Sequence, residues 1–263
     1  MSGTIRRLYL AAATILVTLT VLAAPATAET LVLHPVQDNS LFEEAPTFSN
    51  GAGQHLFAGK ILFGPRRRAL LRFELPSPGV LPAGARITDM RLELHMSRTI
   101  AGDTPMTLHR LTQPWGEGAS DAPGPEGTGT EAMPGDATWT HTFWDAATWD
   151  TPGGDFDVEP SAAAIVGGNG FYSFRSAGML VDMGRTRAQN LRNFGWILLG
   201  DETVNTTAKR FDSREHPDPS LRPRLVIEYE VPERLRPIGA AARPIANSPV
   251  SGRTAAPNRR LLR

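Results

Sequence analysis

The stretch from Leu111 to Phe174 carries the side chains with the clearest chemical potential. It holds four of the five tryptophans and ten Asp or Glu residues, but no Lys or Arg. Flat aromatic rings can stack on the C–H faces of sugars, and carboxylates accept hydrogen bonds from sugar hydroxyl groups. This composition suggests a sugar-binding face, for which we select Trp115, Glu117 and Trp149 as candidate ligand-binding residues. Because tryptophan is more often buried, a structural role for these rings stays open as the alternative.

Catalytic and metal-binding motifs of the familiar kinds do not occur in the sequence. The six histidines show no His-Glu-x-x-His or His-x-His spacing, and there is neither a Gly-x-Ser-x-Gly elbow nor a phosphate-binding loop. His95 and His109 lie on strands that we expect to pair, although two half-exposed strand residues are the simpler interpretation. A glycosidase needs two carboxyl groups about 5–10 Å apart, and Glu117 and Asp145 would be the first candidates. Since nothing in the sequence singles them out, we predict no catalytic residues and keep a small polysaccharide-degrading lyase or hydrolase as an alternative.

The formal charge of zero hides an uneven distribution. Between Glu29 and Val231 there are 18 Lys and Arg against 26 Asp and Glu, whereas residues 232–263 contain seven Arg and one Glu. An acidic body argues against nucleic acid as a partner, because phosphate binding requires a basic surface. An acidic ligand face would also repel anionic polysaccharide, so a neutral glycan or a calcium-mediated contact is more consistent. The absence of cysteine excludes disulfides and thiolate chemistry.

Hydrophobic periodicity predicts a chain made mostly of strands. Phe194–Leu199 is a short apolar run, typical of a strand buried on both faces, and Leu225–Val231 alternates as a half-buried strand does. Ile87–Met96 alternates in the same way. Further strands are expected over Thr30–Val36, Gln54–Phe63, Arg68–Leu75, Met106–Leu111, Ala137–Phe143, Phe156–Glu159 and Phe171–Arg175.

The rest of the chain reads mainly as turns and loops, in keeping with 25 Gly and 22 Pro. Gln37-Asp38-Asn39 is expected to end the first strand, and Gln113–Gly135 to form a long loop. One short helix is expected over Met179–Asn190, with only partly amphipathic spacing.

Both ends of the chain differ from its body. Arg6 and Arg7 precede an apolar run over Leu8–Ala24, and Ala26-Thr27-Ala28 offers the small residues of a cleavage site. This pattern predicts a signal peptide over residues 1–28, cleaved near Ala28, and a secreted, periplasmic or cell-surface protein without a further transmembrane span. An uncleaved membrane anchor is the alternative. Residues 232–263 are rich in Pro, Ala and Arg, so we predict a disordered basic tail that could hold the protein to an anionic envelope.

Several short motifs, in a fixed order, resemble the DNRLRE-type domains of secreted bacterial proteins, some of which are related to carbohydrate-binding modules. The resemblance runs from about Gln37 to Tyr229. Its motifs are Gln37-Asp38 followed by Asn50-Gly51, Arg72-Phe-Glu74 followed by Leu81-Pro-Ala-Gly-Ala85, Trp115-x-Glu117, Asn193-Phe-Gly-Trp196, Ala208-Lys-Arg-Phe-Asp-Ser-Arg-Glu215 and Arg222-Pro-Arg-Leu-Val-Ile-Glu-Tyr229.

The resemblance implies an all-β fold, a jelly-roll-like antiparallel sandwich of two sheets, over residues 29–231. It also implies a secreted, non-catalytic module that binds polysaccharide or cell-envelope glycan, or that serves as a cell-surface or extracellular structural component. The main alternative is a purely structural envelope or matrix protein without a discrete ligand site. Related sandwiches often hold a structural calcium ion near their first and last strands. The oxygen donors nearest to those strands are Asp38, Glu43 and Asp212. The simpler alternatives are that Asp38 caps a turn and that Asp212 pairs with Arg210 or Arg214.

Overall fold

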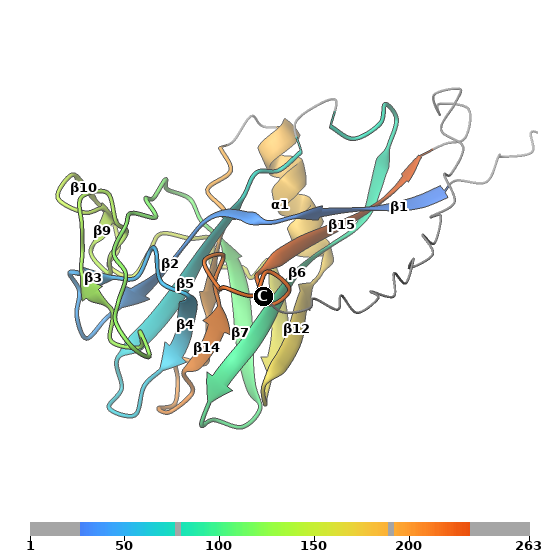
Figure 1. Cartoon of the computed structure of the whole chain (residues 1–263). Coiled ribbons are helices and arrows are strands. Elements are labelled where there is room, and N and C mark those ends of the chain that lie inside the picture. The colour runs from blue at the N-terminus through green and yellow to red at the C-terminus, as the bar shows by residue number, and fades with distance from the viewer. Residues whose placement is uncertain (1–26, 77–79, 189–191, 232–263) are drawn as a thin grey trace, which may run out of the picture.

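A computed structural model describes residues 27–76, 80–188 and 192–231 (Figure 1). The expected signal peptide therefore lies outside the described residues except for Thr27 and Ala28, and so does the expected basic tail. Thr27 and Ala28 already belong to the first strand, opposite Val231 and Glu230 of the last one. The described chain thus begins and ends in two paired strands.

Strands dominate the fold and form two layers that share one strand. The first layer contains β1 (Thr27–Leu33), β15 (Arg224–Val231), β6 (Arg86–Thr99), β12 (Gly170–Arg175) and β14 (Lys209–Asp212). The second contains β2 (Pro35–Phe42), β5 (Arg66–Phe73), β13 (Trp196–Leu199), β7 (Thr104–Arg110) and β11 (Ala162–Val166). The shared strand is β4 (His55–Lys60), which pairs with β14 on one side and β5 on the other.

All pairs in this curled sheet are antiparallel. Its main path runs β1-β15-β6-β14-β4-β5-β13-β7-β11, with β12 added to β6 and β2 added to β5. The long strand β6 pairs with β15 along its first half and with β14 at its end. Two small ribbons complete the strands, β3 (Phe48–Ser49) with β8 (Thr130–Glu131) and β9 (His141–Phe143) with β10 (Ala147–Thr148). The predicted all-β antiparallel sandwich is confirmed, although its two layers are continuous through β4.

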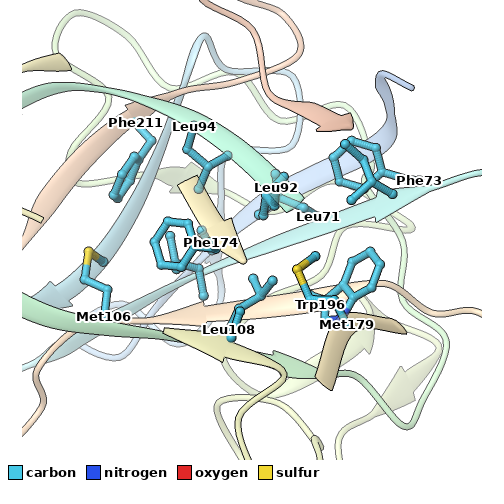
Figure 2. Packing of buried hydrophobic residues seen from close by; sticks show 14 of the residues in the cluster. Leu71, Phe73, Leu92, Leu94, Met106, Leu108, Phe174, Met179, Trp196 and Phe211 are labelled. Atoms are coloured by element: carbon cyan, nitrogen blue, oxygen red, sulfur yellow. The ribbon is translucent and has the colours of Figure 1, made fainter. Parts of the chain in front are cut away.

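The main core lies between the two layers (Figure 2). Leu92 and Leu94 of β6 belong to this core together with Leu71 and Phe73 of β5, and all four side chains are fully buried. The alternation of side chains along each strand places every second residue on this inner face. Helix α1 (Ala177–Ala188) packs against β6 and β11 and contributes Met179 to the core. The single short helix is thus confirmed, and it begins two residues before the predicted start.

The second layer is buried on its outer face as well. Leu70 and Ile197, which alternate with the core residues Leu71 and Trp196, pack into a separate cluster with three tryptophans. The tryptophans are Trp115, Trp139 and Trp149. Because the strands of this layer are covered on both sides, they read as the continuous apolar runs that the sequence shows. The covering chain lies between β7 and β11, and Figure 1 shows its strands β9 and β10 beside β3 and beyond β2.

Several strand predictions need correction. Gln37-Asp38-Asn39 does not end a strand: it lies inside β2, which continues to Phe42. Strand β11 lies at 162–166, where none was expected, whereas Phe156 makes only an isolated bridge with Leu111. Across the described ranges, no helix is long and apolar enough to span a bilayer.

Candidate functional site

An open groove with a volume of about 480 Å³ lies beside β2 and β5. It is lined by Gln37, Arg72, Glu74, Pro114, Trp115, Phe143, Arg192, Asn193 and Phe194. Gln37 and Arg72 face each other on the paired strands, and Arg72 Nε donates a hydrogen bond to Gln37 Oε1. Asn193 is held by backbone contacts, since its Nδ2 donates to the carbonyl of Phe73 at 2.6 Å. Strands and backbone contacts thus give this groove a rigid polar wall.

The two candidate tryptophans are both buried. Trp115 is 3% exposed, and its Nε1 donates to the carbonyl of Phe194 at 2.8 Å. Trp115 lines the groove and also packs into the outer tryptophan cluster. Trp149 is 4% exposed, donates Nε1 to the carbonyl of Thr138 at 2.9 Å, and does not line the groove. The structure therefore gives both rings a packing role, with Trp115 alone next to the groove.

The third candidate, Glu117, belongs to a cluster that we call the carboxylate trio: Asp38, Glu117 and Glu215. One guanidinium holds the trio together, because Arg214 Nη1 lies 2.8 Å from Glu117 Oε2 and 2.6 Å from Glu215 Oε1. The backbone N–H of Arg214 donates to Asp38 Oδ2 at 2.8 Å. The backbone N–H of Asp38 in turn donates to Glu117 Oε1. One arginine thus partly neutralises three carboxyl groups that come from β2 and two distant loops.

Burial governs the protonation of the trio. Desolvation, together with the nearby Glu215 and Glu117 carboxylates, raises the pKa of Asp38 well above its ordinary value. Desolvation also raises the pKa of Glu117 and that of Glu215, although Arg214 opposes both shifts. Asp38 Oδ1 and Glu215 Oε2 are buried and lack hydrogen-bond partners among the described residues. A proton shared within the trio would satisfy both oxygens.

The loop that carries Glu117 is fixed from β2 and from the turn after β3. Asn39 Nδ2 donates to the carbonyl of Glu117 at 2.8 Å and to Ser49 Oγ at 2.9 Å. At Gly51 a Cβ atom would lie 1.7 Å from the same Glu117 carbonyl oxygen, so only glycine fits there. These contacts explain why polar residues occupy the buried middle of β2.

A second group, which we call the imidazole cluster, surrounds Asp212 at the end of β14. Asp212 Oδ2 lies 2.6 Å from His95 Nδ1. Asp212 Oδ1 lies 3.7 Å from His55 Nε2 and 3.8 Å from His216 Nε2. The expected pairing of the strands that carry His95 and His109 is wrong, because β6 and β7 are not neighbours in the sheet. His109 instead contacts Asp157 and Thr107.

The three residues predicted to bind calcium do not form one ligand set. Asp38 belongs to the carboxylate trio and Asp212 to the imidazole cluster. Both carboxylate oxygens of Glu43 are bonded by Arg66, at 3.0 Å from Nε and 2.5 Å from Nη2. Calcium takes six to eight oxygen ligands, and in the trio Arg214 already supplies the positive charge. These residues therefore do not fit the predicted calcium site.

Asp145, the other member of the glycosidase pair considered from the sequence, is not among the hydrogen-bond partners of Glu117. The carboxylate oxygens of Glu117 are bonded by Asp38 N and Arg214 Nη1. Asp145 is exposed in the turn between β9 and β10, with a positive φ of 63°. Left-handed conformations of this kind are typical of Asp in tight turns.

Sequence reasoning missed most of the residues that complete these clusters. His55 and His216 are far apart in the chain, and Arg214 and Glu215 stand out in the sequence only within the motif Ala208–Glu215. The charged run Arg210–Glu215 between two strands was the available signal, because it alternates sign beside the buried Phe211.

Comparison with known proteins gives no family for this chain. No protein-family model matches it, and no curated protein matches it significantly. The resemblance to DNRLRE-type domains therefore stays a prediction that rests on the motifs of the sequence.

Proposed function

We propose that the protein is a secreted, non-catalytic β-sandwich module that binds polysaccharide through the groove beside β2 and β5. The observation that supports this function is the lining of the groove. Three aromatic rings and five hydrogen-bonding side chains surround one cavity of about 480 Å³. Ligand sites commonly combine a concave apolar wall with a few fixed polar groups. The order of DNRLRE-like motifs in the sequence points in the same direction.

The half-buried rings of Phe143 and Phe194 are available for stacking on a sugar face. Gln37 and Asn193 offer amide groups, and Arg72 and Arg192 offer guanidinium donors for hydroxyl or carboxylate oxygens. The two arginines outnumber the one carboxylate of the lining, Glu74, so the groove itself is less acidic than the chain around it. Both neutral and uronate-containing glycans are therefore worth testing.

A structural role without a discrete ligand is the second candidate, and the burial of the tryptophans favours it. Trp115 and Trp149 pack into the outer cluster, where their N–H groups are bonded by backbone carbonyls. Tryptophans used in this way stabilise the fold and leave less aromatic surface for a ligand. The two candidates differ in whether the groove binds anything.

Affinity electrophoresis distinguishes these functions. The chain would be run through gels containing neutral or uronate-containing polysaccharides while soluble products are followed in parallel. Retardation by at least one polymer is expected, without product release. Phe143→Ala and Arg192→Ala should abolish it, whereas Phe63→Ala should not, because Phe63 is 87% exposed and outside the groove.

Three outcomes would contradict the proposal. Normal migration in every gel would favour the structural role. Equal loss of retardation in Phe63→Ala would show that the groove is not the binding site. Release of shortened polymer would instead establish an enzyme. Circular dichroism of each variant ensures that only folded proteins are compared.

A further inference from the structure

The imidazole cluster brings three potential metal ligands together from different parts of the fold. His55 begins β4, Asp212 ends β14, and His216 follows in the next loop. One ligand atom from each residue lies within 4.8 Å of the others. The cluster is separate from the groove, whose lining contains none of these residues.

The buried carboxylate group of Asp212 is the feature that points to a cation site. Its side chain is only 1% exposed, and its Oδ2 is occupied by His95 Nδ1. Its Oδ1 is buried and has no hydrogen-bond partner in the described part of the chain. The distances of 3.7 and 3.8 Å to the two Nε2 atoms are too long for hydrogen bonds. An unpaired buried carboxylate oxygen is destabilising, so an ion between it and the two imidazoles would stabilise this end of the sheet.

We propose that His55 Nε2, Asp212 Oδ1 and His216 Nε2 bind a divalent transition-metal ion, with Zn²⁺ as the ion of best fit. Zinc bonds of about 2.0–2.2 Å in a tetrahedral site place neighbouring ligand atoms about 3.4 Å apart. The two separations from Asp212 Oδ1, 3.7 and 3.8 Å, need to close by only a few tenths of an ångström. Two imidazoles and one carboxylate suit zinc, whereas calcium prefers oxygen ligands alone.

Each ligand also has an outer partner of the kind found around metal sites. Glu126 Oε1 lies 3.3 Å from His55 Nδ1. His216 Nδ1 accepts a hydrogen bond from the backbone N–H of Asp218 at 3.2 Å, and the Asp218 carbonyl lies 3.3 Å from the same nitrogen. His95 holds the second oxygen of Asp212. A metal at Nε2 requires the proton on Nδ1, so binding would direct the Nδ1–H of His55 toward Glu126 and that of His216 toward the Asp218 carbonyl.

A fourth ligand would come from solvent. The side chains of His55 and His216 are 12% and 17% exposed, so water reaches both residues. A metal there would tie the loop after β14 to β4. The same loop carries Arg214 and Glu215, so the ion would also fix the arginine that holds the carboxylate trio.

Calorimetric titration of the full chain, prepared without a histidine tag and freed of metal by chelation, tests the proposal. We expect one Zn²⁺ per chain, a higher melting temperature with Zn²⁺, and no such effect of Ca²⁺ or Mg²⁺. His216→Ala should weaken binding by more than about 100-fold, beyond the 10–100-fold that loss of an outer partner costs. His95→Ala should fall within that 10–100-fold range, because His95 only positions Asp212. His141→Ala is the matched control, because His141 packs against Trp144 away from the cluster, and it should bind normally.

Failure of the wild-type chain to bind Zn²⁺ would overturn the proposal. Unchanged affinity in His216→Ala would do the same, because the ion would then be bound elsewhere. His216→Gln provides a second variant if the alanine variant does not fold, since the residue lies in a loop and not in a strand. Equal loss of affinity in His141→Ala would also contradict the assignment.

Discussion

At the scale of single residues, buried carboxyl groups explain most of the unusual chemistry of this protein. Asp38 and Asp212 are almost fully buried, and each has one oxygen bonded and one oxygen without a partner among the described residues. The neighbours differ: two carboxylates and an arginine surround Asp38, whereas three histidines surround Asp212. The first environment favours a shared proton, and the second favours a transition-metal cation such as Zn²⁺.

The raised pKa of Asp38 predicts how stability depends on pH. A folded-state pKa above the unfolded value means that the folded protein binds the extra proton. This stabilisation is complete below the ordinary Asp pKa and is lost as the pH rises through the raised value. Asp38→Asn removes the ionisation and keeps an acceptor for the backbone N–H of Arg214. We expect the variant to gain stability relative to wild type as the pH rises above the ordinary Asp pKa, by on the order of 1 kcal/mol or more.

Urea unfolding of both proteins at several pH values measures this difference. Hydrogen bonds with Arg66 lower the pKa of Glu43, so both proteins lose the stabilising contribution of this carboxylate in acid. The loss is the same in both proteins and cancels when their free energies of unfolding are compared. Glu74→Gln serves as control, because its side chain is 79% exposed, and should leave the pH dependence unchanged. A constant difference between Asp38→Asn and wild type at all pH values would show that Asp38 does not titrate as described.

At the scale of elements, the chain between β7 and β11 is a cover for the outer face of the second layer. It has little regular structure of its own, and three tryptophans attach it to Leu70 and Ile197. The polar middle of β2 fixes it further, since Asn39 bonds the carbonyl of Glu117. The stretch that reads as a ligand face in the sequence is thus largely a second core.

This interpretation predicts a large stability loss for Trp149→Ala. Removing a buried tryptophan should cost about 3–5 kcal/mol, because its contacts and its bond to Thr138 disappear. Val158→Ala is the control in the same segment, where an 85% exposed side chain should matter by less than about 0.5 kcal/mol. Denaturant unfolding measures both. A Trp149→Ala variant as stable as the control would mean that the outer cluster does not hold the cover.

The sequence reveals some of these elements and conceals others for physical reasons. Alternating or continuous apolar runs predict β6, β13 and β15, because side-chain periodicity is local. Strand β2 is concealed, since Gln37-Asp38-Asn39 reads as the end of a strand. The polar groups of Asp38 and Asn39 are satisfied by distant partners such as the Glu117 carbonyl and the Arg214 N–H. The imidazole cluster is concealed likewise, because His55 and His216 meet only through the pairing of β4 with β14.

At the scale of the whole molecule, β4 makes the two layers one sheet. It pairs with β14 of the first layer and β5 of the second, and core residues of both layers pack between them. We therefore expect a single cooperative unfolding transition. Near-ultraviolet circular dichroism reports on the tryptophans and far-ultraviolet dichroism on the strands, so their midpoints should coincide. Separate midpoints would show that the outer cover or one layer unfolds independently.

The position of β14 has a consequence for the order in which the fold can form. This strand, close to the end of the described chain, lies between β6 and β4 in the interior of the sheet. During synthesis from the N-terminus, β4 and β6 would each keep one unpaired edge until residues 209–212 have been made. Strand β1 would likewise have no partner until β15 has been made. Assembly from such distant segments gives a high contact order, which is associated with slow folding and transient exposure of strand edges.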